Sequence, residues 1–265
     1  MATSRTPATP RPTKPGTAPI TLAIDIGGTG LKASLLDSHG TMLSDRVRAA
    51  TTYPCPPSTM VQALCDLVAP LGSFDRVSVG FPGVVRNGLI LSAPHFVTKR
   101  GPGTSTDKRL RSAWDHFDLA GALGTSFSKP CRVINDADMQ GLDCVQGAGV
   151  ELVITLGTGM GSAVFQNGRL GPRLELSHHP LFDNVTYNDY VGDAVRKRIG
   201  NKKWNRRVAR TINVLDALFF YDHLFIGGGN ARHLTIDLGS KASLIDANAG
   251  ILGGIRLWDA RYVPS

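Results

Sequence analysis

The sequence predicts an α/β protein made of two similar halves, and two observations carry this prediction. First, the stretches LAIDIGGTGLKASLLD (22–37) and LVITLGTGMGSAVF (152–165) share one pattern of strand, tight glycine turn and strand. Second, apolar segments with the character of buried strands alternate along the chain with segments of helical spacing. Because the hairpin recurs after about 130 residues, we infer an internal duplication and expect two halves that face each other.

The first half opens with strands expected at residues 20–26, 31–37 and about 42–48. After the glycine turn, apolar and polar residues alternate with the period of two that is typical of a strand. A glycine turn that leads into a helix would favour a dinucleotide-binding unit. A turn between two strands argues against that unit and indicates a phosphate site built on a hairpin.

The rest of the first half continues with alternating elements. A helix is expected over residues 58–70, where apolar residues recur at helical spacing. DRVSVGFPGVV predicts a strand that ends in a Pro-Gly turn, and VVRNGLIL predicts a hairpin around Asn87 and Gly88. A loop rich in glycine, threonine and basic residues is expected next, before a short helix in FDLAGALGTSF with Asp118 in its first turn. CRVIND then predicts a buried strand, and ADMQGLDCVQGAG a helix.

The second half is expected to be more helical. YNDYVGDAVRKRI and WNRRVARTINVLDALFF are candidate helices, and the second has an apolar stripe on one face. HLFIGGGNARHL predicts a strand that ends in three glycines, with a helix starting after them. A closing helix is expected at about residues 249–262 despite its glycines.

Composition limits the classes of protein that remain. The chain has 265 residues, 42% hydrophobic, and no apolar run long enough to cross a bilayer, so we expect no membrane partner. Residues 1–19, rich in Pro and Thr, predict a disordered tail, with an organelle transit peptide as the weaker alternative. None of the four cysteines forms a C-x-x-C pair, which argues against a zinc or redox motif and fits a reducing cytoplasm.

The formal net charge of +8 is concentrated in two segments. RKRIGNKKWNRRVAR (196–210) carries eight basic residues and no acidic one, and TKRGPGTSTDKRLR (98–111) is also basic. Such segments are typical of a solvated face, and they also fit a polyanionic ligand. We expect no nucleic acid, because no recognisable nucleic-acid module accompanies the charge.

Four motifs stand in order along the chain: AIDIGGTGLK, VINDADMQG, VITLGTGMGS and FIGGGN. Together they resemble the ROK family of sugar kinases, within the actin-like, ribonuclease H-like ATPase superfold. The resemblance implies a two-domain α/β fold with a cleft between the domains. We expect an N-terminal domain at residues 20–135 and a C-terminal domain at residues 136–248, with the closing helix as a candidate to return to the first domain.

The branch that the chain resembles most is that of the polyphosphate glucokinases. ELSHHPLFDN lacks the cysteine-rich zinc motif of typical ROK proteins, as that branch does. The resemblance implies transfer of a phosphoryl group from polyphosphate, ATP or both to the 6-hydroxyl of glucose or mannose, with Mg²⁺, by a cytoplasmic homodimer. Two alternatives are a non-catalytic regulator that binds sugar or polyanions and a nucleic-acid-binding module. ROK repressors carry a helix-turn-helix before the core, for which residues 1–19 are too short and too rich in Pro.

The candidate catalytic residue is Asp136, which follows a buried strand. A carboxylate there can accept the proton of an attacking sugar hydroxyl, and the resemblance assigns this base role to it. An alternative role is the N-cap of the following helix, and one carboxylate can serve both. Asp138 is interpreted as an ordinary first-turn acid of that helix.

The candidate phosphate site consists of the two glycine turns, whose backbone N–H groups can approach phosphate oxygens. Their alternative is a pair of structural hairpins, and Lys32 beside them is either a phosphate ligand or a solvated strand residue. Asp25 would be costly to bury alone, so we expect Mg²⁺, directly or through water, as its partner. A structural carboxylate that accepts turn amides is the alternative. The phosphate-binding candidates are Gly27, Gly28, Thr29, Lys32, Gly157, Thr158 and Gly159.

The sugar and nucleotide sites follow from the resemblance. His95 stands where family members have Asn, and Ser177 replaces the usual glycine after Glu175, so the identity of the sugar stays open. Gly227, Gly228 and Gly229 match the adenosine-side motif, with a tight turn as the alternative. The sugar-binding candidates are Gly83, His95, Asn135, Asp136, Glu175 and His178.

Overall fold

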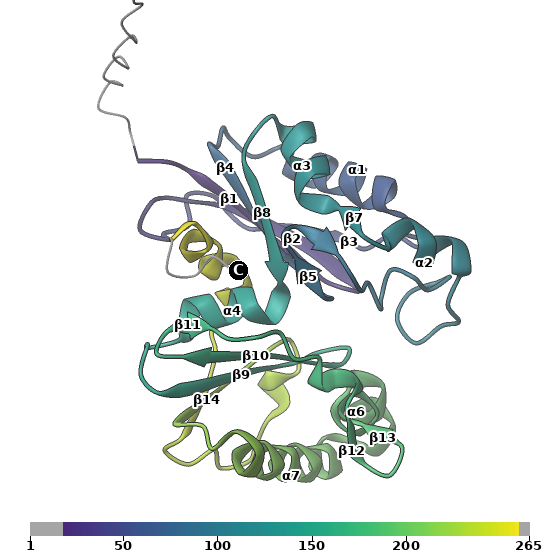
Figure 1. Cartoon of the computed structure of the whole chain (residues 1–265), viewed down its shortest axis with the longest axis vertical. Helices are drawn as coiled ribbons and strands as arrows, with labels where there is room; N and C mark the ends of the chain where they lie inside the picture. The colour runs from purple at the N-terminus through teal and green to yellow at the C-terminus, as the bar shows by residue number, and fades with distance from the viewer. Residues whose placement is uncertain (1–17, 260–265) are drawn as a thin grey trace, which may run out of the picture.

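The computed structural model describes residues 18–259. Most of the tail expected at residues 1–19 and the end of the expected closing helix therefore lie outside the described residues. Two five-stranded sheets form separate layers, with the short helix α4 (Asp136–Cys144) between them (Figure 1). Within residues 18–259, every helix is too short or too polar to span a bilayer.

The first sheet has the order β3-β2-β1-β4-β8. Its central strand β1 is antiparallel to β2 and parallel to β4, and β4 is parallel to β8, so β1, β4 and β8 all end at one edge. The apolar residues of β1 alternate between two cores, as the period of two requires: Leu22 and Ile24 pack beneath α1 and α3, whereas Ala23 packs beneath α4. The bounds of these elements are β1 (Thr21–Ile26), β2 (Gly30–Leu36), β3 (Val47–Ala50), β4 (Arg76–Phe81), β8 (Cys131–Asn135), α1 (Pro57–Val68) and α3 (Leu119–Phe127).

The second sheet, β11-β10-β9-β14-β15, repeats this arrangement. Its strand β9 is antiparallel to β10 and parallel to β14, as β1 is to β2 and β4. Leu152 and Ile154 pack with the helices of the second half, and Val153 packs with α4. The bounds are β9 (Val150–Leu156), β10 (Met160–Gln166), β11 (Arg169–Leu170), β14 (His223–Gly227), β15 (Ala242–Leu244), α5 (Tyr187–Val191), α6 (Asp193–Ile199) and α7 (Asn201–Phe219).

The closing segment packs against α4 and β1 in the middle layer. It is one α-helical turn, α8 (Ala249–Leu252), followed by the 3₁₀ helix η3 (Gly253–Trp258), rather than the single helix expected from the sequence. Its glycines allow this close approach. A Cβ at Gly253 would meet the backbone carbonyl of Met139, and one at Gly254 would lie 3.0 Å from the Cβ of Ala23.

Three other expectations for the first half need correction or refinement. The loop expected after residue 98 contains α2 (Lys108–Trp114), because Asp107 caps it by accepting the N–H groups of Arg109 and Leu110. The third strand lies at residues 47–50 rather than 42–48. Asp118 is the N-cap of α3, not a residue of its first turn.

In the second half, the helix expected after β14 is only a 3₁₀ turn, η2 (Ala231–His233).

In the first half, the expected hairpin at Asn87 and Gly88 is confirmed, since both residues have positive φ, 50° and 80°. The remaining short elements are β5 (Val85–Arg86), β6 (Leu89–Ile90), β7 (Phe117–Asp118), β12 (Pro180–Phe182), β13 (Val185–Thr186) and η1 (Leu176–His178).

Candidate active site

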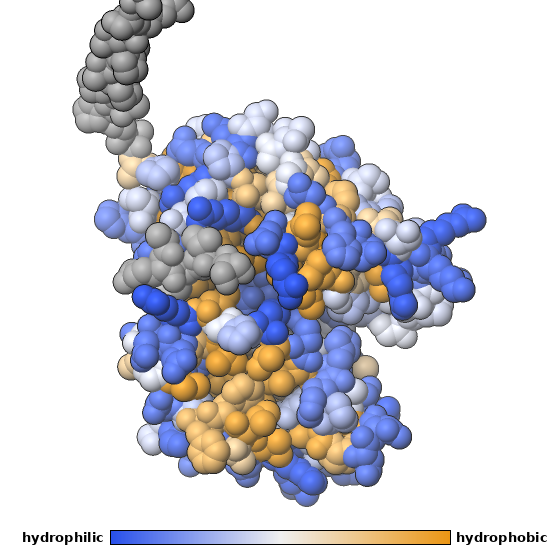
Figure 2. Space-filling model, viewed as in Figure 1, coloured by the Kyte–Doolittle hydropathy of each residue, from blue (hydrophilic) through white to orange (hydrophobic). Residues whose placement is uncertain are grey.

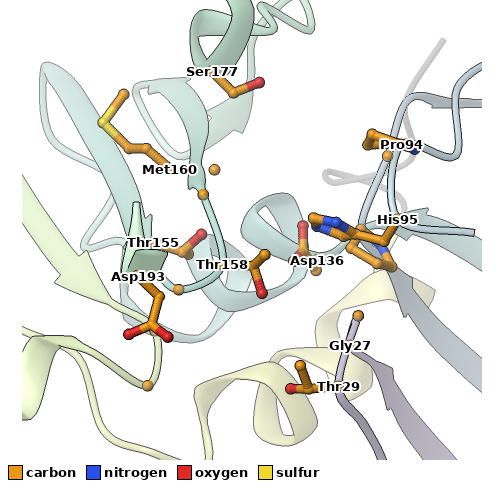
Figure 3. Close-up of a pocket in the computed structure, with 18 of the residues that line it drawn as sticks. Gly27, Thr29, Pro94, His95, Asp136, Thr155, Thr158, Met160, Ser177 and Asp193 are labelled. Atoms are coloured by element: carbon orange, nitrogen blue, oxygen red, sulfur yellow. The ribbon is translucent and has the colours of Figure 1, made fainter. Parts of the chain in front are cut away.

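A cavity of about 490 Å³ is lined by residues of both halves. The surface is notched between the halves in the space-filling view (Figure 2), and Figure 3 shows residues of both glycine turns around the cavity. All but one of the site residues predicted from the sequence line it. These are Asp25, Gly27, Gly28, Thr29, Lys32, Gly83, His95, Asn135, Asp136, Gly157, Thr158, Gly159, Glu175, His178, Gly228 and Gly229.

The exception is Gly227. It is the last residue of β14, and a Cβ there would meet Gln140 Oε1 at 2.7 Å and Ile245 at 3.1 Å. The structure therefore places Gly227 in the packing behind the cavity wall. Gly228 lines the cavity with φ of 84°, and a Cβ there would meet the backbone of Leu156, so this position requires glycine for the turn itself.

Each glycine turn is closed by a backbone hydrogen bond, and the first turn is one residue longer than the second. The N–H of Gly27 donates to the carbonyl of Gly30 at 2.9 Å, and the N–H of Gly157 donates to that of Gly159 at 2.9 Å. Both turns lead into strands, as predicted from the alternating pattern. A Cβ at Gly157 would have no heavy atom within 4 Å, so this backbone is open to a ligand.

Asp136 is the first residue of α4, where β8 ends at the cavity. The N-cap is Asn135, whose Oδ1 accepts the N–H groups of Ala137 at 2.7 Å and Asp138 at 3.3 Å. The suggestion that Asp136 caps the helix is therefore wrong. Asn135 also donates from Nδ2 to the carbonyl of Gly83 at 2.9 Å, which ties the Pro-Gly turn to the start of α4.

Burial raises the pKa of Asp136 to about 7. This value already includes the negative charge of Asp25, which raises the pKa, and the positive charge of Arg173 and the N–H of Ala137, which lower it. A base whose pKa lies near neutral pH combines a sizeable ionised fraction with a strong tendency to accept a proton.

Asp138 is not the ordinary first-turn acid expected from the sequence. It is buried, 6% exposed, and its Oδ1 forms an ion pair with Arg173 Nη1 at 2.6 Å. Burial raises the pKa of Asp138 to about 6, and Arg173 opposes that shift. Sequence reasoning did not single out Arg173. The available signal was an arginine two residues before Glu175 in the expected sugar segment, but nothing in the sequence links it to residue 138.

The sugar-side candidates form one group on the cavity wall. Glu175 Oε1 accepts from Arg173 Nη2 at 2.8 Å, and its Oε2 accepts from the hydroxyl of Ser177 at 3.2 Å. Burial lowers the pKa of His95, and the charge of the nearby His178 lowers it further. The lowered pKa favours the neutral ring of His95, which presents one donor and one acceptor nitrogen.

Asp25 has a partner within the protein. Its Oδ2 forms an ion pair with Lys32 Nζ at 2.8 Å, so that lysine is not merely a solvated strand residue. Within residues 18–259, no group of three or more His, Cys, Asp or Glu could hold a metal ion. Mg²⁺ in phosphate-transfer sites commonly takes one or two carboxylates and completes its shell with phosphates and water, so the single carboxylate of Asp25 fits such an ion.

Several polar residues surround the second glycine turn and were not expected from the sequence. Asn188 Oδ1 accepts the N–H of Met160 at 2.8 Å, and Asn230 Nδ2 donates to the carbonyl of Gly157 at 3.0 Å. Asp193, which pairs with Lys197 at 2.8 Å, also lines the cavity. Other cavity-lining residues that sequence reasoning missed include Gln140, Thr155 and Arg232, whereas Lys197 belongs to the basic segment 196–210.

Comparison with known proteins is consistent with this geometry. The sequence profile of the ROK family matches residues 21–172. The chain is 29% identical over 217 residues to polyphosphate glucokinase of Mycobacterium tuberculosis, covering 79% of this chain and 77% of that protein. It is 28% identical over 247 residues to polyphosphate glucokinase of Mycobacterium leprae, covering 87% of this chain and 72% of that protein.

Two solved structures show the same architecture. The inorganic polyphosphate/ATP-glucomannokinase of Arthrobacter sp. strain KM superposes with a TM-score of 0.76 at 30% identity, covering 90% of this chain and 97% of that one. A ROK family glucokinase from Streptomyces griseus, in complex with glucose and AMPPNP, superposes with a TM-score of 0.72 at 19% identity, covering 90% and 98%.

Two facing sheets, each with a glycine hairpin at a shared cavity, together with these superpositions, define an α/β protein of the two-domain actin-like ATPase fold. The fold class expected from the sequence is thus confirmed. The family profile covers more than half of the chain, and the chain belongs to the ROK family.

Proposed function

We propose that this protein is a sugar kinase that transfers a phosphoryl group from polyphosphate, ATP or both to the 6-hydroxyl of glucose, with mannose as a second candidate acceptor. The observation that carries the proposal is the position of Asp136. A carboxyl group with a pKa of about 7 lies at a cavity that both glycine turns also line. The relatives named polyphosphate glucokinase and polyphosphate/ATP-glucomannokinase support the choice of sugar.

In this proposal Asp136 takes the proton of the sugar hydroxyl as that oxygen attacks the terminal phosphorus of the donor. The bond from this phosphorus to its bridging oxygen breaks, and ADP or polyphosphate shortened by one phosphate leaves. Glu175, His178 and His95 bind the other sugar hydroxyls and hold the attacking oxygen in line, because most of the catalysis of phosphoryl transfer is positioning and charge stabilisation. Asn135 and Gly83 shape the base of the sugar site through their mutual hydrogen bond.

The donor phosphates lie against the two glycine turns, where backbone N–H groups and the hydroxyls of Thr29 and Thr158 are available. Lys32 adds a positive charge there. Asp25 would hold Mg²⁺, directly or through water, and that ion would supply neutralising charge to the phosphates. Gly228 and Gly229 leave room for the nucleoside of ATP. ATP therefore stays a candidate donor beside polyphosphate.

Polyphosphate is favoured as a donor by the residues around the second turn. Asn188, Lys197, Asn230 and Arg232 line this part of the cavity with polar and basic groups, which suit a chain of phosphates better than an adenine ring. In the basic segment 196–210, Arg207 lies over the ring of Tyr190 and Arg210 over that of Phe182, so part of its charge is engaged in packing. The segment still fits either a solvated face or an outer polyanion contact.

The test is to measure glucose-dependent consumption of polyphosphate and of ATP by the purified chain, with mannose and other hexoses in parallel. We expect turnover with glucose and at least one donor. Sugar binding without phosphoryl transfer from either donor would instead support the regulator alternative, which the kinase relatives do not favour.

The same proposal includes assembly and location. We propose a homodimer, which light scattering of the purified chain would test. A cytoplasmic location is supported by the four cysteines, which are all free in the structure.

A further inference from the structure

Arg173 lines the cavity from the irregular segment between β11 and η1 and forms ion pairs with Glu175, which also lines it, and with the buried Asp138. The Arg173 side chain is 15% exposed. Its Nη1 donates to Asp138 Oδ1 at 2.6 Å and to the carbonyl of Ser162 at 3.0 Å. Its Nε and Nη2 donate to Glu175 Oε1 at 3.0 Å and 2.8 Å. The guanidinium therefore joins α4, β10 and the segment that leads into η1.

This arrangement leaves Glu175 little freedom. One carboxylate oxygen is bound by two N–H groups of Arg173, and the other accepts the Ser177 hydroxyl. Arg173 in turn is anchored on the opposite side by Asp138, a buried residue of the same helix as Asp136. A planar guanidinium with bonds on both edges fixes direction as well as distance, which a single ammonium group does not.

We propose that Arg173 is a positioning residue for sugar binding: anchored on Asp138 and on β10, it holds the Glu175 carboxylate in the orientation that receives the sugar hydroxyls. The inference rests on the proposed kinase function. It predicts that loss of Arg173 acts on the sugar through Glu175 and leaves the donor phosphates unaffected, because the donor site lies on the two glycine turns.

The test is a double-mutant cycle with Arg173→Met, Glu175→Gln and the double variant. Glucose affinity is measured by calorimetry, and KM for glucose, KM for the donor and kcat are measured kinetically. Each single variant should weaken glucose binding roughly ten- to hundredfold, the size expected for one or two hydrogen bonds to a charged group. The double variant should be no weaker than Glu175→Gln alone, and donor KM should stay within about twofold of the wild type.

Two further variants guard against a purely structural effect. Arg173→Lys keeps a cation for both carboxylates, so it should bind glucose more tightly than Arg173→Met but less tightly than the wild type. It also keeps the proposal testable if Arg173→Met folds poorly. Arg132→Met removes another partly buried arginine, which donates to the carbonyl of Leu257 and lies over Trp258, away from the cavity. It should leave glucose affinity unchanged.

The proposal is overturned if the losses of Arg173→Met and Glu175→Gln multiply in the double variant, or if Arg173→Met raises donor KM as much as glucose KM. An equal loss of glucose affinity in Arg132→Met would also overturn it. A wild-type chain that neither binds nor phosphorylates any hexose would refute the kinase function itself, which is a distinguishable result.

Discussion

At the scale of single residues, Asp136 shows how burial creates a functional group. Asn135 takes over the N-cap of α4, so the neighbouring carboxylate is left to face the cavity. Its pKa is raised to about 7 because water is replaced by protein and because Asp25 adds negative charge. The same burial makes the ionised form unfavourable in the free protein, a common cost of an active-site charge.

We expect Asp136→Asn to lower kcat by about 10²–10⁴-fold, the usual contribution of a general base. The midpoint of thermal unfolding should stay equal or rise, because the amide removes a buried charge and keeps an acceptor for the N–H of Ala137. Asp66→Asn on the exposed face of α1 is the matched control and should change neither quantity. Retention of wild-type kcat in Asp136→Asn would show that this carboxylate is not the base.

The pH dependence of kcat/KM for glucose tests the same residue in the free protein. A base is active when ionised, so kcat/KM should rise with pH up to about 7 and then level off. Below that pH the value should fall about tenfold per unit. If the rise of kcat/KM had its midpoint near pH 4, the ordinary range of aspartate, burial would not raise the pKa of Asp136 as the structure indicates.

At the scale of elements, the hairpins and the closing segment show two different uses of glycine. Gly157 borders open space at the end of β9, where a ligand can approach the backbone. Gly253 and Gly254 instead lie in contact with α4, β1 and β4. Both uses appear in the sequence as glycine-rich motifs, and only the packing distinguishes them.

Gly157→Ala should leave stability nearly unchanged and raise KM for the phosphate donor, because its methyl group enters space that the phosphates would occupy. Gly72→Ala is the control: its Cβ would make an ordinary 3.7 Å contact with Leu35, outside the cavity. Donor kinetics and thermal unfolding of both variants provide the measurement. An unchanged donor KM in Gly157→Ala would place the phosphates elsewhere.

Gly254→Ala should behave in the opposite way. Its Cβ would lie 3.0 Å from the Cβ of Ala23 and 3.1 Å from that of Ser78, so the middle layer must open. Overpacking of this kind costs about 1–3 kcal/mol of unfolding free energy. Denaturant unfolding against Gly72→Ala measures the loss, and a stability equal to the wild type would mean that the closing segment packs more loosely than described.

At the scale of the whole molecule, the site exists only because the two halves face each other across α4. Periodicity and the repeated hairpin were enough to predict the strands of the first sheet and β9, β10 and β14 of the second, but not the short edge strands β11 and β15. Motif order predicted residues of which all but Gly227 line the cavity, but about half of the lining was not predicted. The pairing of Arg173 with Asp138 was not predictable, because it joins residues 35 positions apart through tertiary packing. The helix α2 was missed because its cap, Asp107, lies within a glycine-rich basic segment that has no clear apolar period.

The cationic lining gives a further prediction at this scale. Lys197→Gln and Arg232→Gln should each raise KM for polyphosphate and weaken its dependence on salt concentration, because each removes one charge that displaces counterions from the polyanion. Arg86→Gln in the exposed part of β5 is the control, with no expected change. Equal effects in all three variants would assign the salt dependence to overall net charge.

The most direct test of the account is to identify the product formed from glucose and each donor by phosphorus NMR, with the wild-type chain and Asp136→Asn side by side. The account predicts glucose phosphorylated on the 6-hydroxyl by the wild type and almost none by the variant. Product in equal amounts from both proteins, or no phosphorylated hexose from any donor, would contradict it.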